Sequence, residues 1–156
     1  MEFRVAGFVQ ESVIDGPGIN FVLFLQGCHK RCEDCHNPEA QPLDGGFLMS
    51  LEEIIDLIPP GMDNVVFSGG EPFIQAKALS VLGERLDVPV IVYTGYQFEE
   101  LKNNEDALSL LKLTKYLIDG EYRKDTPQVA FRGSANQRII DVQASLREGE
   151  TKEVNW

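Results

Sequence analysis

Short apolar runs alternate along this chain with segments of helical periodicity. Strand-like runs occupy residues 3–9, 21–25, 64–67, 88–93, 116–118 and 139–142. Helical patterns occupy residues 50–58, 76–86 and 98–113, the last with a break near Asn103 and Asn104. Such alternation predicts βαβ units around a parallel sheet. Roughly four or five units fit, so we expect one α/β domain over residues 1–156, built as a partial, open parallel barrel instead of a closed eight-unit barrel.

Charge and hydropathy exclude several classes of protein. Lys and Arg number 14 against 25 Asp and Glu, which gives a formal net charge of −11. An acidic surface repels a phosphate backbone, so we expect no nucleic-acid partner and interpret the charge as a solvated surface. No apolar run approaches the roughly 18 residues that span a membrane, and the first residues lack a signal-peptide core. We therefore expect a cytoplasmic protein with no membrane partner.

All three cysteines, Cys28, Cys32 and Cys35, lie in one short segment with C-x3-C-x2-C spacing. An odd, clustered set is a poor disulfide framework. Three thiolates on one loop can hold a [4Fe–4S] cluster and leave one iron open to a small molecule. The alternative is a zinc site completed by His29 or His36, although the chain has no second Cys/His pair. The cysteines alone leave both sites open.

Other polar and glycine-rich motifs follow the predicted strands. They are Gly69-Gly70-Glu71-Pro72, Thr94-Gly95-Tyr96 and Asp119-Gly120. Parallel sheets and barrels carry their functional sites at the edge where the strands end. We therefore expect the motifs to converge on that edge. Each motif also has a plainer interpretation, a turn between a strand and a helix.

The cysteine loop and the Gly69-Gly70-Glu71-Pro72 motif, in this order and each after a strand, resemble the radical S-adenosylmethionine superfamily. The resemblance implies that the three cysteines hold a [4Fe–4S] cluster whose open iron binds the amino and carboxylate groups of S-adenosylmethionine. It also implies that residues 69–72 hold the methionine amino group, with Glu71 accepting from the ammonium. Asp34 departs from the aromatic or apolar residue frequent before the third cysteine, so we expect no side-chain stacking on adenine from it.

Further motifs resemble one branch of that superfamily. Asp15-Gly16-Pro17-Gly18 resembles the DGPG of glycyl-radical-enzyme activating proteins, and residues 35–38 (CHNP) resemble the pyruvate formate-lyase activating enzymes. Residues 94–96 (TGY), 118–120 (IDG) and 131–137 (FRGSANQ, where WRGSSNQ is usual) resemble the activating proteins of anaerobic ribonucleoside-triphosphate reductase. The resemblance runs from about residue 13 to residue 141.

What the resemblance implies is an activase. An external low-potential electron donor reduces the cluster, S-adenosylmethionine is cleaved to a 5′-deoxyadenosyl radical, and that radical takes a hydrogen from a glycine of a partner enzyme. We expect the partner to be an anaerobic ribonucleotide reductase ahead of a pyruvate formate-lyase. The remaining alternatives are a small-molecule radical enzyme, such as a deazapurine synthase, and a non-enzymatic zinc-binding module.

Several residues carry two interpretations. The turn residues Asp15, Gly16 and Gly18 either contact the substrate or only shape a turn. Thr94 and Asp119 are expected to bind the cofactor, because functional groups gather at strand ends in barrel-type folds. Arg132 and Asn136 either act in the site or only tie down a C-terminal loop, and the sequence leaves their role open. His29 and His36 either donate to the cluster sulfurs or are solvated.

Overall fold

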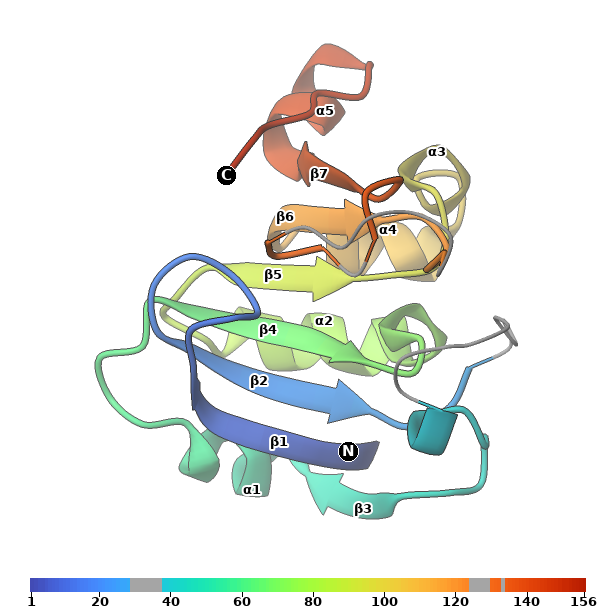
Figure 1. The fold of residues 1–156 in the computed structure, drawn as a ribbon. Coiled ribbons are helices and arrows are strands. Elements are labelled where there is room, and N and C mark those ends of the chain that lie inside the picture. Colours follow the sequence, from blue (N-terminus) through green and yellow to red (C-terminus); the bar gives the residue numbers. More distant parts are fainter. Residues whose placement is uncertain (29–37, 124–129, 133) are drawn as a thin grey trace.

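The computed structural model describes residues 1–28, 38–123, 130–132 and 134–156, and its centre is one seven-stranded sheet (Figure 1). The strands are β1 (Glu2–Ser12), β2 (Asn20–Leu25), β3 (Phe47–Ser50), β4 (Asn64–Gly69), β5 (Val90–Tyr93), β6 (Thr114–Asp119) and β7 (Arg138–Asp141). Their order across the sheet is β3-β1-β2-β4-β5-β6-β7. Since β3 and β7 stand at opposite edges, the sheet is open among the described residues. The mixture of helices and strands confirms the predicted α/β class.

The strand directions differ from the prediction at both edges. Strands β2, β4, β5 and β6 run parallel, but β1 is antiparallel to β2 and β3, and β7 is antiparallel to β6. The prediction of a wholly parallel sheet is therefore wrong for the pairs β3–β1, β1–β2 and β6–β7. A parallel crossover needs roughly a dozen residues or more, and the short segment 13–19 between β1 and β2 allows only a hairpin. Before β7, the described part of residues 120–137 contains no helix to carry a crossover.

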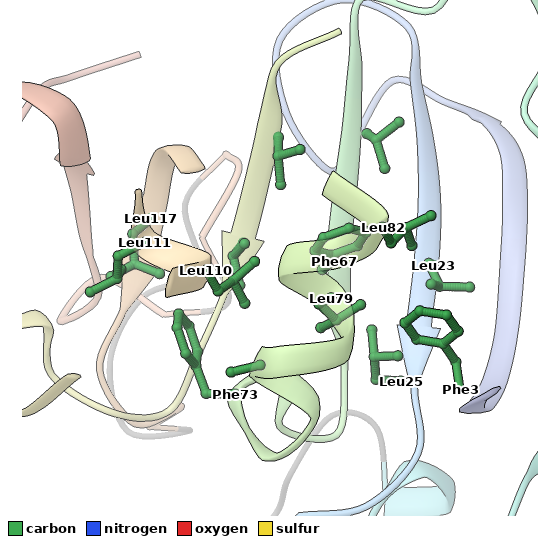
Figure 2. Packing of buried hydrophobic residues seen from close by; sticks show 14 of the residues in the cluster. Phe3, Leu23, Leu25, Phe67, Phe73, Leu79, Leu82, Leu110, Leu111 and Leu117 are labelled. Carbon is green, nitrogen blue, oxygen red and sulfur yellow. The ribbon is translucent and has the colours of Figure 1, made fainter. Parts of the chain in front are cut away.

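Helices cover one side of the sheet, called here the helical face. Helices α1 (Leu51–Leu57), α2 (Ala76–Glu84) and α4 (Glu105–Leu111) lie behind the strands in Figure 1. Figure 2 shows how α2 and α4 meet the strands, through the buried side chains of Leu79, Leu82, Leu110, Leu23 and Phe67. This larger core anchors the parallel strands. The remaining elements are η1 (Pro38–Ala40), η2 (Pro72–Gln75), α3 (Phe98–Leu101) and α5 (Val142–Glu148).

The opposite side, called here the inner face, has a second and smaller apolar cluster. It consists of Val22, Val66, Ile91, Ile118 and Ile139, which alternate along their strands with residues of the helical face. Segment 13–19 runs in front of β4 and β5 on this side (Figure 1). A Cβ placed on Gly16 would lie 3.2 Å from the Cδ1 atom of Ile91. The inner face is thus covered by a loop where the other face is covered by helices.

Local signals in the sequence account for most helix boundaries. Ser50 and Glu53 form the predicted capping box at the start of α1, each side chain accepting from the backbone N–H of the other. The predicted break is confirmed, since α3 ends at Leu101 and Asn104 caps α4. The strand β3 was not predicted, because four residues are too few to show a period. Among the described helices, none has the length and apolar composition to cross a membrane.

Candidate active site

The cysteine loop begins directly after β2, and its base is closed by backbone hydrogen bonds. The N–H of Gly27 donates to the carbonyl of Ala40 at 2.7 Å, and the N–H of Cys28 donates to the carbonyl of Gln41 at 2.9 Å. Cys28 is half-buried at this base. The predicted ligands Cys32 and Cys35, together with His29, Asp34 and His36, lie outside the described residues. The structure thus places one end of the predicted ligand set at the edge where the parallel strands end, called here the carboxyl edge.

The second predicted motif packs directly against that loop base. The N–H of Gly70 donates to Leu25 at 2.8 Å, and the N–H of Glu71 donates to Gly27 at 2.7 Å. A Cβ on Gly70 would lie 2.3 Å from the carbonyl oxygen of Gly27 and 2.5 Å from that of Ala40. Only glycine allows so close an approach of two backbones. The two motifs that are far apart in the sequence therefore meet through their main chains.

The carboxylate of Glu71 links this motif to the end of β5. It is 1% exposed. Its Oε2 accepts from the N–H of Phe73 at 3.0 Å, and Oε1 accepts from the N–H of Gly95 at 2.8 Å. The hydroxyl of Thr94 lies 2.9 Å from Oε1 and 2.8 Å from Oε2. Because a carboxylate has about four acceptor positions, these donors occupy most of its capacity.

Asp119, at the end of β6, is completely buried and pairs with an arginine that the sequence interpretation missed. Its Oδ2 accepts from the N–H of Phe98 at 2.8 Å. Arg138 donates through Nε to Oδ1 at 2.9 Å and through Nη2 to Oδ2 at 2.5 Å. Arg138 also reaches Glu99, with 2.8 Å between Nη2 and Oε1. This bidentate pair ties β7 to β6 and to the start of α3.

The charges in this group shift one another's proton affinities. The hydrogen bond from Arg138, the largest cause, lowers the pKa of Glu99 to about 2. Hydrogen bonds to Asp119 and then to Glu99 raise the pKa of Arg138. The arginine is therefore a permanent cation beside two carboxylates. A charged residue opening an otherwise apolar strand, opposite an aspartate, was the signal in the sequence that could have identified Arg138.

In its described part, the motif at residues 131–137 mainly makes hydrogen bonds to the segment that follows β6. Asn136 donates to the carbonyl of Glu121 at 2.9 Å, and Gln137 donates to the carbonyl of Gly120 at 2.8 Å. The backbone N–H of Gly120 in turn donates to Tyr96 at 3.0 Å. Arg132 donates through Nη1 to the carbonyl of Gln137 at 3.3 Å. The bond of Asn136 agrees with the interpretation that it ties down a loop, and these bonds connect the ends of β5 and β6 to this segment.

The Asp15–Gly18 turn departs from the expected convergence on one edge. Because β1 runs antiparallel, Ser12 pairs with Asn20, and the turn starts at the opposite edge of the sheet from the cysteine loop. Asn20 donates to the carbonyl of Gly16 at 3.0 Å. The Asp15 carboxylate accepts from Ser12 at 2.6 Å. The turn reaches the end of β5 only by folding over the inner face, where the hydroxyl of Tyr93 lies 3.1 Å from the carbonyl oxygen of Asp15.

A cleft of about 380 Å³ lies beside the carboxyl edge. Its walls come from η2, α3, α4 and the loops between them, and the lining residues are Phe73, Ile74, Tyr96, Glu100, Leu101, Asn104 and Ala107. The volume suits a small ligand. None of the predicted site residues lines this cleft, so it is separate from the arrangement of Cys28, Glu71 and Asp119.

The donor set suits an iron–sulfur cluster. Within the part of the chain that the structure describes, no three Cys, His, Asp or Glu side chains come together as a metal site. Cys28 is the one predicted thiolate ligand in that part, and its backbone is fixed by the closed loop base. Thiolates are the usual ligands of iron–sulfur clusters, and the chain's other two thiols stand on the same loop.

Comparisons with known proteins agree with this chemistry. The family model of a 4Fe–4S single cluster domain matches residues 14–140. The anaerobic ribonucleoside-triphosphate reductase-activating protein of Enterobacteria phage T4 is 30% identical over 138 residues, which cover 81% of this chain and 86% of that protein. The protein of the same name from Vibrio cholerae is 31% identical over 142 residues, with 81% and 90% covered. The pyruvate formate-lyase-activating enzyme of Clostridium pasteurianum is 37% identical over 134 residues, covering 77% of this chain and 56% of that enzyme.

Proposed function

The chain belongs to the family of 4Fe–4S single cluster domains and, within it, to the activating proteins of glycyl-radical enzymes, and we propose that its partner is an anaerobic ribonucleoside-triphosphate reductase. The structural observation that carries the activase chemistry is the direct joining of the cysteine loop's base to the Gly69-Gly70-Glu71-Pro72 motif. The choice of partner rests on the comparisons. A plain turn would not need Gly70 pressed against Gly27 and Ala40 at the base of a cysteine loop.

The proposal assigns the cluster to Cys28, Cys32 and Cys35. When bound, a reduced [4Fe–4S] cluster supplies the electron that cleaves S-adenosylmethionine and starts hydrogen abstraction from the partner's glycine. The protein's part is to hold these components and exclude water. The hydrogen bonds of Gly27 to Ala40 and to Glu71 fix the base of the loop beside the end of β4. The electron that the cluster supplies comes from an external low-potential electron donor.

We further propose that the sheet is the core of a partial, open barrel. Its four parallel strands carry helices on one face and leave the inner face to loops. A ligand at the carboxyl edge would lie next to the inner face. Barrel-type folds place their reactive groups at this edge.

Residues of the carboxyl edge are proposed to hold S-adenosylmethionine, namely Gly69, Gly70, Glu71, Pro72, Thr94 and Asp119. The Glu71 carboxylate would accept from the methionine ammonium with an oxygen that already accepts from Thr94 and Gly95. Its contribution is therefore partly to fix the two neighbouring loops. Asp119 acts in the same way, because both of its oxygens accept from Arg138. These residues shape the edge before the cofactor arrives.

The partner is proposed to approach the inner face, where Asp15, Gly16 and Gly18 would contact its glycine-bearing segment. The neighbouring side chains of Val13 and Ile14 are 66% and 77% exposed. Adjacent apolar residues with this exposure, beside a structured turn, suit contact with another protein.

The choice of reductase over lyase rests on the extent of the similarity. The match spans 86–90% of the two reductase-activating proteins described above but 56% of the lyase-activating enzyme. The lyase remains the second candidate, because its activating enzyme has the higher identity, 37%. The TGY, IDG and FRGSANQ segments favour the reductase.

Electron paramagnetic resonance separates the candidates. The chain is reconstituted anaerobically with iron and sulfide, reduced, and mixed with S-adenosylmethionine and either enzyme. We expect a glycyl doublet on the reductase. A doublet on the lyase alone would contradict the partner assignment and would still support the proposed radical chemistry. Cofactor cleavage without a doublet on either enzyme would favour a small-molecule substrate, and no cleavage at all would contradict the activase.

A further inference from the structure

Tyr93, the last residue of β5, joins two segments that the sequence keeps far apart. Its hydroxyl lies 2.7 Å from the carbonyl oxygen of Phe131 and 3.1 Å from the carbonyl oxygen of Asp15. Its ring belongs to the inner-face cluster with Ile91, two residues earlier on the same strand. The phenol therefore stands between the Asp15–Gly18 turn and the segment that begins the FRGSANQ motif.

The hydroxyl has one hydrogen for two acceptors. Burial and then the charge of Asp15 raise the pKa of Tyr93, so the phenol stays protonated at ordinary pH. A protonated phenol can donate to one carbonyl fully or share its hydrogen unequally. The shorter distance favours Phe131, and Asp15 is held more loosely.

Phe131 is held under strain at this point. Its φ of 64° is the one positive value among the described non-glycine residues. A bulky residue adopts this conformation only where its surroundings enforce it, and such strain gathers at functional segments. Trp156 meets the ring of Phe131 edge-on at 5.4 Å, and Tyr93 bonds its carbonyl. Two contacts from distant parts of the chain thus fix this residue.

We propose that Tyr93 is a positioning residue for the partner enzyme, whose hydroxyl holds the Asp15–Gly18 turn and the Phe131 segment together over the inner face. The proposal rests on the activase function. The end of β5 then has two roles. Thr94, the residue after the strand, points its hydroxyl to Glu71, while Tyr93 points to the inner face. The Thr94 side serves the cofactor, and the Tyr93 side serves the protein substrate.

Tyr93→Phe tests the proposal, since it removes the hydroxyl and keeps the ring. The matched control is Tyr116→Phe, on the same face of the next strand, because the Tyr116 hydroxyl makes no hydrogen bond to the described residues. The reconstituted proteins are compared by rates of glycyl radical formation at varied concentrations of the reductase. With a typical hydrogen-bond contribution, we expect KM for the reductase to rise about 2- to 10-fold in Tyr93→Phe. We expect kcat to change less than KM, and the control to match the original protein.

Hydrogen exchange provides a readout that does not depend on activity. We expect faster amide exchange in residues 12–19 and 130–132 of Tyr93→Phe and unchanged exchange in Tyr116→Phe. Unchanged KM in Tyr93→Phe, or a rise in KM for S-adenosylmethionine instead of the reductase, would overturn the proposal. Exchange equal to that of the control would overturn it also. If the unsubstituted protein forms no radical on either enzyme, the activase function itself fails, which is a distinct result.

Discussion

Glu71 and Thr94 are joined across the gap between β4 and β5, with the threonine hydroxyl 2.8 and 2.9 Å from the two carboxylate oxygens. Both residues are nearly inaccessible to solvent, with exposed fractions of 1% and 4%. A hydrogen bond to a buried charge is stronger than one between neutral groups. The pair therefore couples two loops that the proposed cofactor site requires side by side.

Thr94→Val keeps the shape of the side chain and removes its hydroxyl. We expect the free energy of unfolding to fall by about 1.5–3 kcal/mol, the usual contribution of a hydrogen bond to a charged group. Urea denaturation measures this change. Thr94→Ser keeps the hydroxyl and should retain most of the stability. A larger loss in Thr94→Ser than in Thr94→Val would mean that packing of the methyl group, and not the hydrogen bond, matters here.

Glu71→Gln tests the charge at the same site. If the carboxylate helps to hold the methionine ammonium, loss of about 1.5–3 kcal/mol weakens S-adenosylmethionine binding by roughly 10- to 150-fold. Anaerobic titration calorimetry of the cluster-loaded protein measures Kd, and the iron content should stay unchanged. An unaltered Kd would remove the Glu71 charge from the binding site.

Cys28→Ala removes one of only three thiols in the chain. We expect bound iron and the visible absorption of the cluster to drop, and cleavage of S-adenosylmethionine to be lost, because no other cysteine can replace the ligand. Far-ultraviolet circular dichroism should be unchanged, since Cys28 lies after the end of β2. Lys77→Ala, at an exposed position of α2, serves as the control. Retention of full activity by Cys28→Ala would contradict the cluster assignment.

The lowered pKa of Glu99 predicts a dependence of stability on pH. Because the folded pKa of about 2 lies below the unfolded value near 4.5, the ionised carboxylate stabilises the folded state fully above the unfolded value. That stabilisation is lost as the pH falls through the window from about 4.5 to 2. Glu99→Gln should therefore lose less stability than the original protein between pH 6 and pH 2. Parallel curves of unfolding free energy against pH would argue against the Arg138–Glu99 pairing.

Gly18→Ala should destabilise the Asp15–Gly18 turn for two reasons. The φ of Gly18 is 78°, and an added Cβ would lie 2.4 Å from Oδ2 of Asp63. The matched control is Gly61→Ala, where φ is 83° but no atom lies within 4 Å of the added Cβ. The positive φ alone costs roughly 1–2 kcal/mol at either site. Thermal denaturation should show a larger loss for Gly18→Ala, and equal losses would mean that Asp63 moves aside freely.

Much of the fold could be predicted from local patterns. Ser50 and Glu53 showed where α1 begins, and Asn103 with Asn104 showed the break between α3 and α4, because caps act over a few residues. The direction of β1 could also have been inferred, since segment 13–19 is too short for a crossover. The strand β3 was not predicted, because four residues are too few to show an alternating pattern.

The sequence by itself determined the chemistry that this protein can perform. Three thiols on one loop and two adjacent glycines before a glutamate limit the ligands that such segments can hold, whatever lies around them. Only the tertiary structure decided the partners of these groups. It brought Arg138 to Asp119, Thr94 to Glu71, and Tyr93 between Asp15 and Phe131. These contacts join residues distant in the chain, so they depend on the order of the strands across the sheet, which no local pattern encodes.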